Sequence, residues 1–145
     1  MSLFSSLAVS ASGMSAQKTR AELLVENLAN AETTRTPDGG PYRRKDVVFA
    51  EDNSAGSFSS ELSSALGSGM SGVMVSETTV DNSEPERRYL PGHPDADQNG
   101  YVAFPKINPA EDMVDLLGAS RSYEANVAAI SAVKDMIQKS LDLFR

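Results

Sequence analysis

The chain has 145 residues, a formal net charge of -7 and no cysteine. This length fits one small domain with extensions, and the acidic balance argues against nucleic acid or an anionic membrane surface as a partner. Without cysteine the chain has no disulfide, no thiolate nucleophile and no cysteine-ligated metal.

Residues 3–30 carry an apolar heptad stripe, which predicts a helix that packs against a partner helix. The stripe consists of Phe4, Leu7, Ala11, Met14, Ala21, Val25 and Leu28, and Lys18 interrupts it. Its residues are small, serine is frequent and Gly13 lies near the middle. We therefore expect this helix to be marginal by itself and to need a partner.

The middle of the chain, residues 33–107, is predicted to form a β-rich domain. Residues 36–41 are dense in turn-forming Pro, Gly and Asp. Short strands are expected at residues 47–49, 73–80, 88–90 and 101–104, the last two around a turn-rich segment. Residues 53–72 are rich in Ser and Gly, which predicts a flexible loop.

A second amphipathic helix is predicted from Asn108 to the end of the chain. Asn108 is a suitable N-cap and Pro109 a favourable first residue. The apolar stripe consists of Met113, Leu116, Tyr123, Val127, Ile130, Ile137 and Leu141. Each of the two stripes contains one lysine, Lys18 or Lys134, and a lone polar residue on such a seam often sets the register.

Together these elements predict an α+β fold. The terminal segments, residues 1–32 and 108–145, are expected to pair as an antiparallel coiled coil. The β-rich domain, residues 33–107, is then an excursion at one end of the pair. The two apolar stripes together form the predicted coiled-coil seam.

Three local patterns look like chemical sites, and each is better explained as a loop or turn. Residues 67–72 match G-x-G-x-x-G, but no helix is expected after them to receive a pyrophosphate. Residues 95–100 resemble half of a calcium loop, but its twelfth position is Lys106 instead of a glutamate. His93 is the only histidine and has no further zinc ligands. We expect no enzyme, no metal, no cofactor and no small-molecule substrate.

One segment has a specific resemblance. The run N-L-A-N-A-E-T-T at residues 27–34 resembles the signature of the bacterial flagellar rod and hook proteins. Its continuation, T-P-D-G-G-P-Y-R-R-K at residues 36–45, is similar to the proximal rod members of that family. Two further matches follow in order, at residues 93–102 and 111–127. Only residues 53–72 lie clearly outside the resemblance.

The resemblance implies a structural subunit of the proximal rod of the flagellar basal body. Such a subunit is exported unfolded by the flagellar type III apparatus, without a cleaved signal peptide. It then assembles in the periplasm with other rod proteins and with itself into a helical tube that transmits torque from the motor to the hook. The first residues of the chain fit this route, because they lack the basic start and apolar run of a signal peptide.

Residues 27–45, called the assembly motif below, are implied to contact neighbouring subunits. The implied contact residues are Asn27, Leu28, Asn30, Thr33, Thr34, Pro37, Gly39, Gly40, Tyr42, Arg43 and Arg44. The residues alone leave a simpler reading open, in which this segment is a helix stop followed by a turn. They also leave open a coiled-coil adaptor that forms a discrete oligomer instead of a filament.

Overall fold

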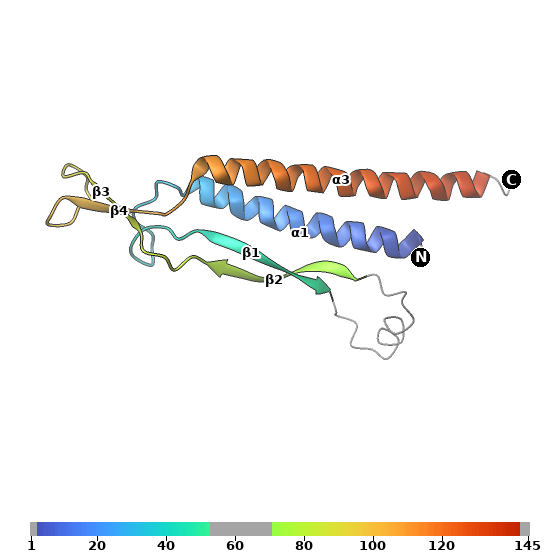
Figure 1. Cartoon of the computed structure of the whole chain (residues 1–145), viewed down its shortest axis with the longest axis horizontal. Helices are drawn as coiled ribbons and strands as arrows, with labels where there is room; N and C mark the ends of the chain where they lie inside the picture. The colour runs from blue at the N-terminus through green and yellow to red at the C-terminus, as the bar shows by residue number, and fades with distance from the viewer. Residues whose placement is uncertain (1–2, 53–70, 143–145) are drawn as a thin grey trace.

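The computed structural model describes residues 3–52 and 71–142 (Figure 1). The elements in chain order are α1 (Leu3–Ala29), β1 (Lys45–Asp52), β2 (Gly72–Val80), β3 (Glu86–Tyr89), β4 (Tyr101–Phe104) and α3 (Pro109–Asp142). Two long helices therefore flank a small antiparallel β insert, and the predicted α+β fold is confirmed. The molecule is elongated along its helices.

Helices α1 and α3 lie side by side and run in opposite directions (Figure 1). Arg20 lies 3.9 Å from Asp115 across the pair. Further along, Gly13 faces Asn126, whose side chain would lie 3.2 Å from a Cβ added to the glycine. The predicted cap of α3 is present, because Asn108 Oδ1 accepts a hydrogen bond of 3.2 Å from the Ala110 N–H.

The face that the two helices bury differs from the predicted coiled-coil seam. The buried apolar residues of the pair are Ala16, Leu24, Ala119 and Val133. Half-buried members of the predicted seam are Leu7, Met14, Ala21, Leu28, Leu116, Ile130 and Ile137. Exposed members are Phe4, Ala11, Val25, Met113, Tyr123, Val127 and Leu141. These exposed members are not buried by the other helix of the same chain, and their role as a coiled-coil seam stays a prediction.

The offset has a physical reason. Small residues such as Gly13, Ala16 and Ala119 let the two helix backbones approach on a face beside the predicted one. Helix α1 also contacts the hairpin of β1 and β2, so its buried surface faces two neighbours. The two lysines of the predicted seam are likewise exposed, and Lys18 pairs with Glu22 of its own helix at 3.6 Å.

Strands β1 and β2 form an antiparallel ladder from Lys45↔Val80 to Asp52↔Gly72. This hairpin lies along α1 (Figure 1), so the expectation that the whole insert sits at one end of the helix pair is wrong. The Val73 N–H donates a hydrogen bond of 3.0 Å to Ser12 Oγ of α1. The contact beside it is close, because a Cβ on Gly72 would lie 2.7 Å from Ser12 Oγ and would force that side chain to shift.

The predicted flexible loop, residues 53–72, lies outside the described residues except for its last two positions. Of these, Gly72 begins β2. Thus a strand follows the G-x-G-x-x-G match.

Strands β3 and β4 pair antiparallel at the end of the molecule where α1 ends and α3 begins (Figure 1). Tyr89 and Tyr101 form an edge-to-face pair with ring centroids 5.4 Å apart. Between the strands, Asp97 Oδ1 accepts hydrogen bonds from the N–H groups of Asn99 and Tyr101. The segment that resembles a calcium loop is therefore a turn that satisfies its own backbone.

Within residues 3–52 and 71–142, no helix has the length and apolar character needed to cross a lipid bilayer. The same residues contain no group of three or more acidic or histidine side chains arranged to hold a metal ion.

Candidate functional site

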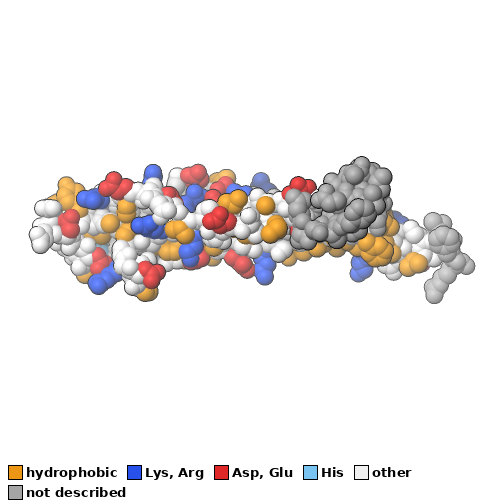
Figure 2. All heavy atoms as spheres, turned by 90° about the horizontal axis from the view of Figure 1, so that it is seen from below, with side chains coloured by type: hydrophobic (Ala, Val, Ile, Leu, Met, Phe, Trp, Pro, Cys, Tyr) orange, Lys and Arg blue, Asp and Glu red, His pale blue; other side chains and the backbone are white. Residues whose placement is uncertain are grey.

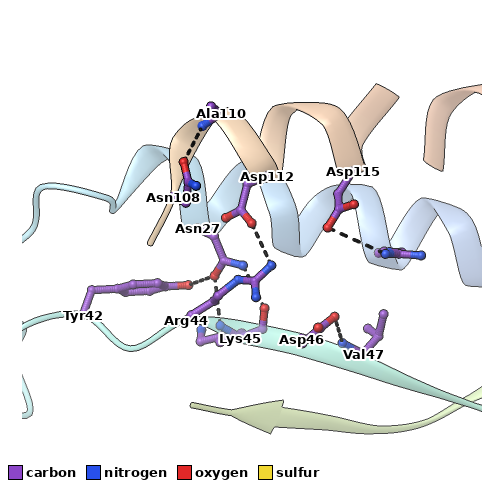
Figure 3. Close-up of polar contacts among 11 residues, drawn as sticks. Asn27, Tyr42, Arg44, Lys45, Asp46, Val47, Asn108, Ala110, Asp112 and Asp115 are labelled. Carbon is purple, nitrogen blue, oxygen red and sulfur yellow. Dashed lines mark hydrogen bonds and ion pairs between the residues drawn. The ribbon is translucent and has the colours of Figure 1, made fainter. Parts of the chain in front are cut away.

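The assembly motif folds around the end of α1, and Asn27 holds it there (Figure 3). This side chain is fully buried at 0% exposure. Its amide donates to the Lys45 carbonyl at 2.8 Å, and its Oδ1 accepts from the Lys45 N–H and the Tyr42 hydroxyl, each at 3.0 Å. The last full turn of α1 is therefore fastened to the start of β1.

Tyr42 is buried beside Asn27 and close to the charged pair of Glu26 and Lys45. Burial, and after it the neighbouring Glu26 carboxylate, together raise the pKa of the Tyr42 hydroxyl to about 12. The hydroxyl therefore stays protonated at neutral pH and keeps donating its hydrogen bond to Asn27.

The turn between Asn30 and Tyr42 is closed by its own hydrogen bonds. Thr33 Oγ1 donates to Asn30 Oδ1 at 3.1 Å, and the Tyr42 N–H donates to the Thr33 carbonyl at 3.0 Å. At the tip, Gly39 and Gly40 have φ angles of 88° and 83°, which side chains with a Cβ rarely adopt. The motif thus needs glycine there for a backbone reason.

An ion pair joins residues 111–127, the third segment of the resemblance, to the assembly motif. Arg44 Nη2 lies 2.7 Å from Oδ1 of Asp112, in the first turn of α3 (Figure 3). The Asp112 side chain is 1% exposed. Burial alone would lower the pKa of the Arg44 guanidinium, but the charge and hydrogen bond of Asp112 outweigh it, so that pKa is raised.

Residues 93–102, the second segment of the resemblance, also contact the assembly motif. Thr34 Oγ1 donates to Asp95 Oδ2 at 2.8 Å, and Arg35 lies 3.8 Å from the same carboxylate. His93 Nδ1 accepts a hydrogen bond from the Asp95 N–H, and its ring lies 6.4 Å from the ring of Phe104. Three segments far apart in sequence therefore converge at one end of the helix pair. We call this convergence the junction.

The structure divides the predicted contact residues between the junction and the surface. Asn27 and Tyr42 are buried, and Leu28, Asn30, Thr33, Thr34 and Arg44 are half-buried. Pro37, Gly39, Gly40 and Arg43 are exposed, and Arg43 donates a hydrogen bond of 2.6 Å to Asn82 Oδ1. The list of predicted contacts omitted Lys45, Asp95 and Asp112, although all three lie within the segments that carried the resemblance.

The helix pair leaves much of its apolar surface uncovered. The large exposed apolar residues of α3 are Met113, Val114, Leu117, Tyr123, Val127, Met136 and Leu141. A groove of about 510 Å³ runs between α1 and α3, with Ala21, Leu116, Leu117 and Tyr123 among its walls. On the face that Figure 2 shows, acidic and basic side chains are interspersed with apolar ones along the molecule.

Comparisons with known proteins match both the helical end and the whole chain. Residues 98–143 match the family model described as flagellar basal body rod FlgEFG protein C-terminal. The flagellar basal-body rod protein FlgC of Bacillus subtilis is 43% identical, with 99% of each chain covered. FlgC of Borreliella burgdorferi is 40% identical over 100% of this chain and 99% of its own. FlgC of Salmonella typhimurium is 38% identical over 99% of this chain and 98% of its own.

The chain belongs to the FlgC family of flagellar basal-body rod proteins. This confirms the resemblance carried by the assembly motif and the two later segments. Members of the FlgC family are proteins of the flagellar basal-body rod. The matched family model covers β4, α3 and Asp112, so the α3 side of the junction lies within it.

Proposed function

We propose that this chain is a structural subunit of the proximal rod, and that it assembles with itself and with other rod proteins into a helical tube. The tube transmits torque from the motor to the hook, and its subunits reach the periplasm unfolded through the flagellar type III apparatus, without a cleaved signal peptide. The observation that carries the proposal is the identity of 38% to 43% to three FlgC proteins over nearly the whole of each chain.

The exposed apolar face of the helix pair supports assembly through the helices. Val114 and Leu117 of α3 are 68% and 58% exposed, and Leu117 lines the groove beside α1. Contiguous apolar surface of this kind marks a contact with another protein. A head-to-tail contact that does not close on itself builds a helical tube. In this proposal, the exposed members of the predicted coiled-coil seam lie between subunits.

The junction supports a second contact region. Its buried hydrogen bonds hold the turn of the assembly motif in one conformation, and the exposed residues Pro37, Gly39, Gly40 and Arg43 lie on that turn. A rigid exposed turn loses little conformational freedom when it binds, which favours affinity. We propose these exposed residues as contacts with a neighbouring rod protein.

The test is a deletion strain complemented with the parent chain or with variants. We expect the deletion strain to be non-motile and to lack complete rods in electron micrographs of isolated basal bodies, and the parent chain to restore both. Intact rods and motility in the deletion strain would overturn the proposal. A discrete oligomer of the concentrated protein, together with intact rods in that strain, would favour the coiled-coil adaptor.

A further inference from the structure

The spacing of the residues that face α1 leaves the register of the helix pair ambiguous. On α3 these residues include Asp112, Ala119, Asn126 and Val133, which are seven positions apart and buried or half-buried. A parallel stripe, Leu116, Tyr123, Ile130 and Ile137, has the same spacing. A slip of α3 by one heptad, roughly 10 Å along the helix, would keep this second stripe apolar throughout, although on the first stripe it would exchange the polar Asp112 and Asn126 with the apolar Ala119 and Val133.

The junction removes this ambiguity. Asn27 of α1 holds the backbone of Lys45, and the adjacent Arg44 pairs with Asp112 of α3 (Figure 3). The segment between the helices is therefore fastened to α1 on one side and to α3 on the other. A one-heptad slip would separate Arg44 from Asp112 and leave the buried Asp112 carboxylate without its partner, which is strongly unfavourable.

The Arg44–Asp112 pair stabilises the fold less than well-packed apolar side chains would at the same positions. Asp112 Oδ2 and Arg44 Nε are both buried and have no hydrogen-bond partner among the described residues. Removing two charges from water is costly, and the attraction between them offsets this cost only when the remaining polar atoms are also satisfied. The lysines of the predicted seam do not serve this purpose, because both are exposed.

We propose that the Arg44–Asp112 pair fixes the register in which α1 and α3 pack, and that it does so at a cost in stability. This inference rests on the proposed function, because every subunit of a helical tube must present the same surface to its neighbours. A single register keeps that surface uniform, even though apolar residues at positions 44 and 112 would make the fold more stable. The pair thus selects one register of α1 against α3.

Because the chain has no cysteine, introduced disulfides can report the register directly. Gly13→Cys with Asn126→Cys reports the observed register, since these residues face one another. Gly13→Cys with Ala119→Cys or with Val133→Cys reports a slip of one heptad in either direction. In the observed register the latter pairs are displaced by roughly 10 Å along the helix, beyond the roughly 7 Å between Cα atoms that a disulfide spans.

In the parent background we expect cross-linking only between positions 13 and 126, seen as faster migration of the monomer on a non-reducing gel. In the background Arg44→Met with Asp112→Leu, we expect cross-linking to spread to position 119 or 133. The same double variant should unfold about 5 °C higher than the parent. Arg44→Met alone should unfold at a lower temperature than the parent, because it leaves the Asp112 charge buried without a partner.

The matched control is Lys18→Met with Glu22→Leu, which removes an ion pair that is exposed on α1. It should leave the cross-linking pattern of the parent unchanged. Cross-linking that stays confined to position 126 in the Arg44→Met, Asp112→Leu background would overturn the proposal. So would a lower unfolding temperature of that double variant, or a parent chain in which positions 13 and 126 do not cross-link.

Discussion

Asn27 links three backbone and side-chain groups at the end of α1, and all of its hydrogen bonds are inside the protein. Asn27→Ala would leave the N–H and carbonyl of the half-buried Lys45, and the hydroxyl of the buried Tyr42, without these hydrogen-bond partners. We expect a loss of about 2 to 3 kcal/mol in the free energy of unfolding, measured by urea denaturation. Asn99→Ala, at an exposed turn, is the control and should change it by less than about 0.5 kcal/mol. An equal effect of the two variants would contradict the role of Asn27.

Tyr42 gives the junction a dependence on alkaline pH. Its folded pKa is about 12 against an ordinary value of 10.0, because burial and then the Glu26 charge disfavour the phenolate. The stabilising contribution of the protonated hydroxyl is therefore complete below pH 10 and is lost as the pH rises from 10 to 12. Tyr42→Phe cannot ionise, so its stability should fall less than that of the parent over this range.

The measurement is the free energy of unfolding of parent and variant across that range. Tyr89→Phe, which changes a tyrosine that is 64% exposed, serves as the matched control. Parallel curves for the parent and Tyr42→Phe would contradict the assignment.

At the residue level, the sequence could identify the assembly motif but not its partners. Thr34 and Asp95 are separated by 61 positions, and Arg44 and Asp112 by 68. No local pattern encodes which distant carboxylate meets which donor, because that depends on the packing of the complete chain. The two left-handed glycines were part of the predicted motif, since a turn signal is local.

At the level of elements, the close contact between the hairpin and α1 depends on Gly72. A Cβ at this position would collide with Ser12 Oγ, which also accepts the hydrogen bond from the Val73 N–H. We expect Gly72→Ala to loosen the far end of the hairpin and to speed hydrogen exchange of the β2 amides. Gly92→Ala is the control, because no atom lies within 4 Å of the Cβ that it would add. Unchanged exchange in Gly72→Ala would show that Ser12 can move aside.

Helices and strands were predictable because their signals are local. The Asn108 cap, the heptad stripes and the β-branched strands each occupy a few adjacent turns or residues. The face by which α1 meets α3 was not predictable in the same way. Large apolar residues marked one stripe, whereas Gly13, Ala16 and Ala119 allowed closer approach on the next. The division into a helical domain, residues 1–32 and 108–145, and a middle domain, residues 33–107, stays a prediction.

For the whole molecule, the exposed apolar face of α3 should matter for assembly and not for folding. Leu117 is 58% exposed, so Leu117→Asp should change the free energy of unfolding by less than about 0.5 kcal/mol. We expect the same variant to fail to restore motility to a deletion strain, because a buried carboxylate would disrupt the contact between subunits. Thr78→Asp, on the exposed face of β2, is the control and should restore motility.

A Leu117→Asp strain that swims as well as the complemented parent would remove this face from the proposed interface. A variant that fails to swim but is also unfolded would point to a role in folding, and circular dichroism of the purified protein separates the two outcomes.

The antiparallel course of α1 and α3 brings the start of one helix and the end of the other to the same extremity of the molecule, while the turn between β3 and β4 occupies the opposite one (Figure 1). A short affinity tag fused at either terminus would therefore lie toward the same extremity, and moving it from one terminus to the other would not carry it to the opposite end of the subunit. For labelling in living cells, the exposed residues Gln98 and Asn99 of that turn offer an insertion point at the far end of the subunit.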